Sequence, residues 1–158
     1  MSYLDRINVC KAPDLSVYMP FVIDGHIVGY VKPALIAKLQ DFQDTFTVTR
    51  EFLKLNHRLQ GVEGRTKGVG EVMETLMQCG VVPGWRGEKY KVAATYSAPT
   101  VFEIERAAVP LFGTIGCGVH MNGVTWRSGE LCMWVGKRSL SKPTEAGKLD
   151  QMVAGGQP

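Results

Sequence analysis

The sequence changes its pattern at Gly113, and this change constrains the fold more than any other feature. Before Gly113, apolar residues recur at helical spacing in two segments and form strand-length runs in several others. After Gly113, the apolar runs are short and are bounded by glycines or turn residues, which is typical of strands. We therefore predict an α+β protein in two parts, with a small α+β domain over residues 1–110, a strand-rich part over residues 111–158, and residues 102–113 joining them.

The first part has one strong hairpin signal and one strong helix signal. Asp24-Gly25 separates two apolar runs, and both positions of such a turn require positive φ. Residues 66–79 carry a single apolar face, and Gly80 follows as a helix cap. The complete set of elements predicted here is a hairpin over 21–31, a helix that starts at Pro33, strands over 46–49 and 52–55, and the helix over 66–79.

The second part predicts a long hairpin and one further strand. The turn Arg127-Ser128-Gly129 separates the two arms of the hairpin. Residues 148–156 form a third short strand that is expected to break at a Gly155-Gly156 turn. Without Cβ atoms, this turn would let the backbone approach a ligand closely. The alternative is a plain turn from strand to loop.

Composition and charge exclude several classes of protein. Hydrophobic residues make up 45% and charged residues 21% of the chain, and no apolar run is long enough to cross a bilayer. The net charge of +3 is too small to indicate a nucleic acid polymer as partner. The first residues lack the pattern of a secretory signal, and the four cysteines form no C-x-x-C pair, so we expect a cytoplasmic protein.

Positive charge is concentrated in one loop of the second part. Residues 136–148 carry four basic residues and one acidic residue: Lys137, Arg138, Lys142, Lys148 and Glu145. A loop of this sign beside a glycine turn suits a phosphate-bearing ligand, and its charge and placement make Arg138 and Lys148 the candidate contacts. The alternative is a solvated hairpin loop that binds nothing.

A second candidate binding site is Trp85-Arg86, within the turn P-G-W-R-G-E. A tryptophan at a turn can stack on a flat heterocycle, and an adjacent arginine can hold a phosphate. The alternative is that Trp85 buries its ring between elements of the domain.

Several chemistries are excluded by the pattern itself. The sequence has no G-x-S-x-G elbow, and the glycines of residues 61–70 have the wrong order for a phosphate loop, so they predict a solvent loop before the helix. Cys117 and His120 would point to opposite faces of a strand and could not share a metal ion. The dense carboxylate cluster that magnesium needs does not occur, so we assign no catalytic residue.

Four segments together resemble one subfamily of Nudix hydrolases. They are G-W-R-G-E-K-Y at 84–90, F-x-I-E-R-A-A-V-P-L-F-G at 102–113, G-V-H-M-N-G at 118–123, and the run from W-V-G-K-R-S to A-G-G-Q-P at 134–158. The subfamily carries an N-terminal domain of unknown function and is related to the Nudix portion of fungal thiamine pyrophosphokinase fusions and to plastid Nudix enzymes. The resemblance covers nearly the whole chain. It implies that the second part supplies the first strands of a Nudix α/β/α sandwich.

The resemblance also implies a chemistry. Its members hydrolyse a diphosphate linkage with magnesium and release a monophosphate, and they are associated with damaged thiamine diphosphates or oxidised guanine nucleotides. A small-molecule diphosphate is therefore the expected partner. By analogy with the first glycine of the Nudix motif, the backbone of Gly156 would approach the metal. The glutamate-rich helix of that motif does not occur in this sequence, so we expect magnesium only in a complete enzyme and no hydrolysis by this chain alone.

Other outcomes stay open. The first part could be a non-catalytic module that binds substrate, or a module for dimerisation. A sandwich sheet that lacks one helix layer leaves an apolar face exposed, which predicts low solubility or a homodimer. No membrane is expected as a partner.

Overall fold

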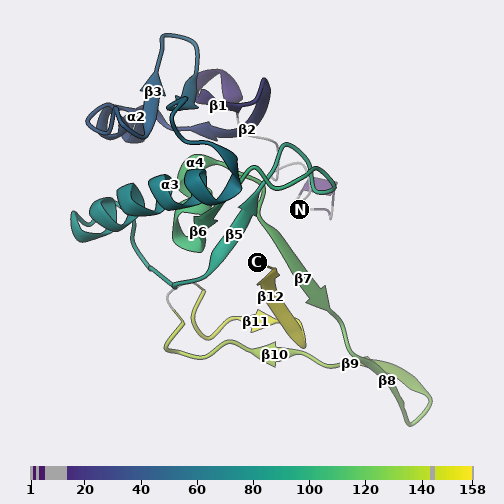
Figure 1. The fold of residues 1–158 in the computed structure, drawn as a ribbon. Coiled ribbons are helices and arrows are strands. Elements are labelled where there is room, and N and C mark those ends of the chain that lie inside the picture. Colours follow the sequence, from purple (N-terminus) through teal and green to yellow (C-terminus); the bar gives the residue numbers. More distant parts are fainter. Residues whose placement is uncertain (1, 3, 6–13, 143–144, 158) are drawn as a thin grey trace. The chain divides into compact units, whose positions relative to one another are not determined.

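The chain forms two compact units, Met1–Ile115 and Gly116–Pro158 (Figure 1). Their structure is a computed structural model that describes residues 2, 4–5, 14–142 and 145–157. Helices and strands both occur, so the predicted α+β class is confirmed.

The first unit is built on a four-stranded sheet in the order β2-β1-β4-β3. Its strands are β1 (Met19–Ile23), β2 (His26–Val31), β3 (Phe46–Val48) and β4 (Leu53–Leu55), and a single turn of 3₁₀ helix, η1 (Leu15–Val17), precedes β1. β1 and β2 form the predicted hairpin, because Asp24 and Gly25 both adopt positive φ, at 50° and 82°. β1 runs parallel to β4, so the residues that follow these two strands emerge at the same edge of the sheet.

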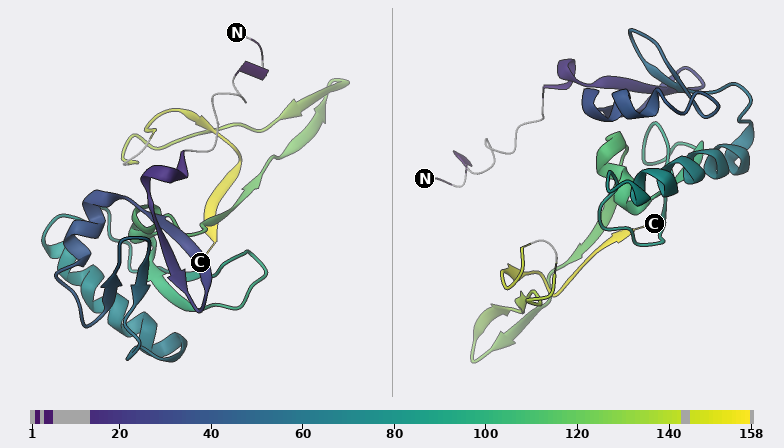
Figure 2. Two further views of the ribbon diagram at one scale, coloured as in Figure 1. Left: turned by 90° about the horizontal axis from the view of Figure 1, so that it is seen from above. Right: turned by 90° about the vertical axis from the view of Figure 1, so that its left-hand side faces the viewer.

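Two longer helices belong to the first unit. α2 (Pro33–Leu39) begins at Pro33, as predicted, and turns Leu35, Ile36 and Leu39 into the core. α3 (Gly61–Gln78) ends before Gly80, whose φ of 72° is the left-handed conformation expected of a cap. Figure 2 shows α3 as the longest helix of the unit.

The start of α3 differs from the prediction, which treated residues 61–65 as a solvent loop. These residues are helical. A Cβ on the buried Gly68 would lie 2.9 Å from the Leu59 side chain, so this glycine lets Leu59 pack closely against the helix. Tertiary packing therefore outweighs the low helix propensity of a glycine-rich segment.

Residues 102–113, which we expected to join the two parts, instead lie in the core of the first unit. They form β6 (Phe102–Glu105), the 3₁₀ helix η2 (Arg106–Ala108) and the short helix α4 (Val109–Phe112), and β6 pairs with β5 (Lys89–Val92). Phe102 and Phe112 are fully buried and pack on Phe21, with ring centroids 6.0 and 5.6 Å away. The segment is apolar because it fills the core, so the expectation of a connector is wrong.

The second unit consists of strand pairs. Its strands are β7 (Cys117–Met121), β8 (Val124–Arg127), β9 (Glu130–Met133), β10 (Gly136–Lys137), β11 (Leu149–Asp150) and β12 (Val153–Gln157). β8 and β9 form a hairpin at the predicted turn, where Ser128 and Gly129 have φ of 53° and 84°, and it is visible as a narrow two-stranded arm (Figure 2). The hairpin is shorter than predicted, because β7 pairs with β12 and does not continue the ladder with β9. β10 pairs with β11, and β7 pairs with β12.

The pairing of β7 with β12 contradicts the predicted turn at Gly155-Gly156. Both glycines lie inside β12, where they pair with Val119 and Gly118. A Cβ on Gly118 would lie 3.0 Å from the carbonyl oxygen of Gly155, so the small residues let the two strands approach. The glycines thus mark a close strand contact and not the end of a strand.

No described side chain of the second unit is buried. Every core residue of the structure lies at or before Phe112, whereas Trp126 is 72% exposed and Leu140 is 83% exposed. Two-stranded pairs of this kind are marginally stable without a covering layer.

Candidate functional site

The turn that carries Trp85 and Arg86 is organised by one buried carboxylate. Glu105 is 7% exposed, and it accepts hydrogen bonds from the backbone N–H groups of Arg86 at 2.8 Å, Gly87 at 3.1 Å and Ala107 at 3.2 Å. Trp85 is partly buried and packs against the hydrophobic core, while Arg86 is exposed. The contacts of Trp85 therefore fit the packing alternative, whereas Arg86 faces solvent.

Charged and aromatic side chains flank this turn. Arg106 forms an ion pair with Glu88 at 2.7 Å, and its guanidinium lies 5.7 Å from the centroid of the Tyr90 ring. The hydrogen bond to Glu88 raises the pKa of Arg106 above its ordinary value. The buried hydroxyl of Tyr90 has no hydrogen-bond partner among the residues that the structure describes. These contacts fix β5 against β6 beside the turn.

Arg138 and Lys148 lie next to each other in the second unit, where β10 ends and β11 begins. The backbone N–H of Arg138 donates to the carbonyl of Lys148 at 2.9 Å. Their side chains contact carboxylates: Arg138 pairs with Asp150 at 2.5 Å, and Lys148 pairs with Glu145. The hydrogen bond from Arg138 lowers the pKa of Asp150, and the hydrogen bond from Lys148 lowers that of Glu145.

These two ion pairs offset two of the four positive charges that the sequence concentrates in this loop. Asp150 follows the loop in the sequence, and only the pairing of β10 with β11 brings it to Arg138. The phosphate-binding roles of Arg138 and Lys148 stay predictions. An anion at this place would have to compete with two carboxylates.

Gly156 lies in β12, and the structure brings no acidic cluster to it from the described residues. In residues 2, 4–5, 14–142 and 145–157, no group of three or more His, Cys, Asp or Glu residues is arranged to hold a metal ion. His120 hydrogen-bonds through Nδ1 to Oε1 of Gln151. The approach of the Gly156 backbone to a metal therefore stays a prediction.

A pocket in the first unit was not predicted from the sequence. It has a volume of about 300 Å³ and lies where the β1–β2 turn, the end of β4 and the start of α3 meet. Its lining residues are Val22, Ile23, Asp24, Gly25, Lys54, Leu55, Asn56, His57, Leu59, Gln60 and Arg65. Because β1 and β4 are parallel, the residues after both strands reach this edge together.

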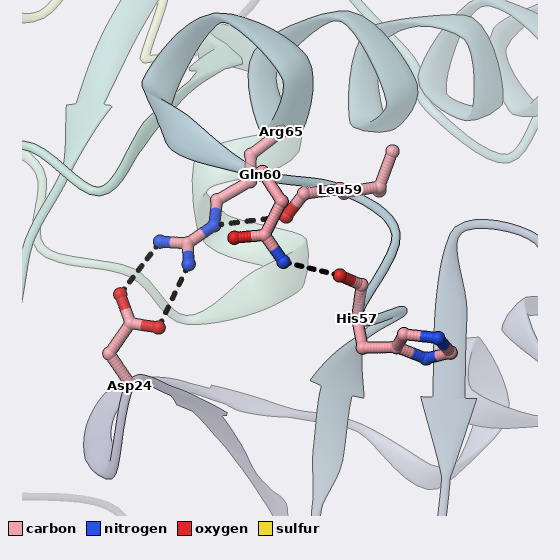
Figure 3. Close-up of polar contacts among 5 residues, drawn as sticks. All are labelled: Asp24, His57, Leu59, Gln60 and Arg65. Carbon is pink, nitrogen blue, oxygen red and sulfur yellow. Dashed lines mark hydrogen bonds and ion pairs between the residues drawn. The ribbon is translucent and has the colours of Figure 1, made fainter.

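Arg65 and Asp24 belong to the pocket lining and contact each other (Figure 3). Nη1 and Nη2 of Arg65 each donate to one carboxylate oxygen of Asp24 at 2.8 Å, and Nε donates to the carbonyl of Leu59 at 3.4 Å. The hydrogen bonds that Arg65 donates to the Asp24 carboxylate lower the pKa of Asp24. Gln60 donates its carboxamide N–H to the carbonyl of His57, which fastens the loop before α3.

The sequence carries no local signal for this pair. Asp24 and Arg65 are separated by 41 positions, and Arg65 lies in the glycine-rich segment that was read as a solvent loop. Helix periodicity starting at Gly61 would have placed Arg65 on α3, but its partner depends on the sheet topology.

Residues 2–115 match a family described as a domain of unknown function, DUF4743. The match covers more than half of the chain and spans nearly all of the first unit, so the protein belongs to the DUF4743 family.

Curated relatives extend this likeness across both units. The chain is 42% identical, over 99% of its length, to Nudix hydrolase 20, chloroplastic, and to Nudix hydrolase 24, chloroplastic, both of Arabidopsis thaliana. It is 28% identical, over 89% of its length, to the uncharacterized protein YJR142W of Saccharomyces cerevisiae. It covers 45%, 44% and 43% of these proteins, so it spans under half the length of the relatives that it matches. The predicted resemblance to Nudix hydrolases is confirmed.

The names of these relatives contradict one prediction. Both Arabidopsis proteins are named chloroplastic, so the expectation of a cytoplasmic protein is wrong. That expectation came from the missing features of a secretory signal, which say little about other compartments. Among the described residues, no helix is both long enough and apolar enough to cross a bilayer.

Proposed function

We propose that this chain is part of a Nudix pyrophosphohydrolase that cleaves the diphosphate of a small organic molecule and releases the monophosphate. The observation that carries the proposal is 42% identity, over 99% of the chain, to two proteins named Nudix hydrolases. Because this likeness includes the second unit, it is not confined to the DUF4743 domain.

The magnesium of such an enzyme does not fit the described residues. Magnesium requires oxygen ligands in near-octahedral geometry, usually with carboxylates among them, and no described group of three acidic, His or Cys residues offers this arrangement. We therefore assign no step of hydrolysis to residues of this chain and place the metal on the remainder of a complete enzyme. Residues 1–158 alone are then inactive.

The exposed strands of the second unit support this division. On one face of the β8–β9 hairpin, Val124 pairs with Met133 and Trp126 pairs with Leu131, and all four side chains are more than half exposed. A continuous apolar face of this kind needs a cover. The cover that we propose is the rest of the Nudix domain, because the relatives are more than twice as long as this chain.

For the substrate we propose a damaged thiamine diphosphate or an oxidised nucleoside diphosphate, handled in plastids as the names of the plant relatives suggest. The contribution of this chain is recognition. Arg86, held at an exposed turn by Glu105, is the candidate phosphate contact of the first unit, and Arg138 and Lys148 are those of the second.

Turnover by the complete polypeptide tests this proposal. Oxythiamine diphosphate and an oxidised guanine nucleoside diphosphate are incubated with magnesium, and the products are separated by ion-exchange chromatography. The proposal predicts conversion of at least one compound to its monophosphate. If the complete polypeptide converts neither compound, the proposed substrate class is wrong.

A second candidate function is a binding module without chemistry. It is favoured by the lack of a metal-ligand group among the described residues and by the presence of a pocket in the first unit. Calorimetry of the chain with oxythiamine diphosphate separates the two. The module is favoured if the chain binds oxythiamine diphosphate, if Arg86→Ala loses that binding, and if the complete polypeptide does not hydrolyse the compound.

A further inference from the structure

The pocket beside α3 contains a guanidinium with unused hydrogen-bonding capacity. The Arg65 side chain is only 14% exposed. A guanidinium carries two N–H groups on each terminal nitrogen and one on Nε. One N–H of each terminal nitrogen donates to Asp24, and the N–H of Nε donates to Leu59. The second N–H of each terminal nitrogen has no acceptor within the part of the chain that the structure describes. A mostly buried donor without an acceptor favours an acceptor that arrives from solvent.

The other lining residues indicate which acceptor fits. Asp24 is the single acidic residue of the lining, and both of its oxygens already accept from Arg65. Lys54 adds a second cationic side chain to the lining, whereas the carboxamides of Asn56 and Gln60 each already donate to a backbone carbonyl. Two cationic side chains beside one carboxylate suit an anion better than a cation.

Apolar side chains share the pocket with these polar groups. Val22, Ile23, Leu55 and Leu59 contribute to the lining. The volume of about 300 Å³ lies at the lower end of the range for small-molecule sites. A ligand of matching chemistry has an anionic end and a compact organic end.

We propose that this pocket binds a small phosphate monoester, with a phosphate oxygen on a free N–H group of Arg65 and its organic group against Leu55 and Leu59. The two oxygens of Asp24 already accept from the fork formed by one N–H of Nη1 and one N–H of Nη2, and this pair fixes the orientation of the guanidinium. The two remaining terminal N–H groups lie on opposite edges of the planar group, so each can donate to one phosphate oxygen. The site lies wholly in the first unit and does not depend on the proposed hydrolase activity, so failure of either proposal leaves the other standing.

Calorimetric titration of the 158-residue chain tests the site with two probes, inorganic phosphate and phenyl phosphate. We expect saturable binding of both at millimolar or lower concentration, with phenyl phosphate binding about tenfold more tightly because its ring covers apolar side chains. Arg65→Lys keeps a charge beside Asp24 but removes the remaining guanidinium N–H donors, and it should weaken phenyl phosphate binding about tenfold, the loss expected for a charge-assisted hydrogen bond. The matched control is Arg58→Lys, an exposed arginine outside the pocket lining.

Two further variants keep the test decisive if Arg65→Lys does not fold. Gln60→Glu adds a carboxylate on an exposed side chain of the lining and should weaken binding, whereas Asp24→Asn removes the neighbouring negative charge and should strengthen it. Circular dichroism checks the fold of each variant. The proposal would be overturned if neither probe shows saturable binding. It would also be overturned if Arg65→Lys and Arg58→Lys lose equal affinity for phenyl phosphate. Equal affinity for the two probes would contradict the contact with Leu55 and Leu59.

Discussion

Single carboxylates decide the local geometry at both polar sites of the first unit. Glu105 holds three backbone N–H groups, and Asp24 holds the fork of Arg65. Glu105 is buried, whereas the side chain of Asp24 is 59% exposed, so solvent screens Asp24 far more strongly. The two carboxylates are therefore expected to differ in their effect on stability.

Replacing Glu105 should be strongly destabilising. In Glu105→Ala, three backbone donors lose a charged acceptor, and the free energy of unfolding should fall by about 3 kcal/mol. Urea denaturation followed by circular dichroism measures this change. Glu103→Ala is the control, since the Glu103 side chain on the same strand is exposed. Equal effects of the two substitutions would contradict the role assigned to Glu105.

Asp24 predicts a small dependence of stability on pH. Arg65 lowers the pKa of Asp24 in the folded state below its unfolded value of about 4, so the stabilisation is present above that value and is lost as the pH falls through the folded pKa. When the pH falls from about 6 to about 3, the free energy of unfolding should therefore decrease less in Asp24→Asn than in the parent chain. The difference between the two decreases should be under about 1 kcal/mol. Urea midpoints at the two pH values measure this difference. Asp41→Asn, outside the pocket lining, should follow the parent, and identical pH profiles for Asp24→Asn and the parent would count against the pair.

At the scale of elements, local sequence signals predicted where helices and strands begin and end better than they predicted which elements pack or pair with one another. Asp24-Gly25, Pro33 and Gly80 act through their own φ preferences, and the turn, helix start and helix cap that they predicted are all present. The position of β12 depends on its pairing with β7, and the position of α3 on contact with Leu59. Contacts between residues far apart in the chain are not visible as a periodic spacing of apolar residues. The strand break at Gly155 and the helix start at residue 66 were therefore predicted wrongly.

Two glycines of the first unit should respond in opposite ways to alanine. A Cβ on Gly29 in β2 would lie 2.4 Å from the carbonyl oxygen of Phe112, so Gly29→Ala forces β2 and α4 apart and should cost about 3 kcal/mol. Gly70 lies in α3 with no atom within 4 Å of its Cβ position, so Gly70→Ala should stabilise by about 0.5–1 kcal/mol. Thermal denaturation of both variants measures the signs. A neutral Gly29→Ala would contradict the close backbone packing.

At the scale of the whole molecule, the candidate sites were only partly visible in the sequence. Trp85, Arg86, Arg138 and Lys148 became candidates because aromatic and basic residues at turns are conspicuous in a sequence, and their roles stay predictions. Their carboxylate neighbours Glu105 and Asp150 were not, because strand pairing brings them into place. The family and the likeness to Nudix hydrolases emerged from longer motifs and were confirmed by comparison.

The uncovered apolar strands predict self-association of residues 1–158. Trp126 and Leu131 are cross-strand neighbours that are 72% and 61% exposed. The double variant Trp126→Lys, Leu131→Glu replaces them with an opposite-charge pair and should shift the chain toward the monomer in light scattering. Thr125→Lys, on the other face of the hairpin, should leave the association unchanged. A monomeric parent chain would contradict this prediction.

Magnesium-dependent phosphate release, compared between the complete polypeptide and residues 1–158, tests the central claim most directly. Purified samples at equal concentration receive the same panel of diphosphates, and inorganic phosphate is followed colorimetrically. We predict release by the complete polypeptide only, because the described residues hold no group that could bind the metal. Magnesium-dependent release by residues 1–158 themselves would contradict the account.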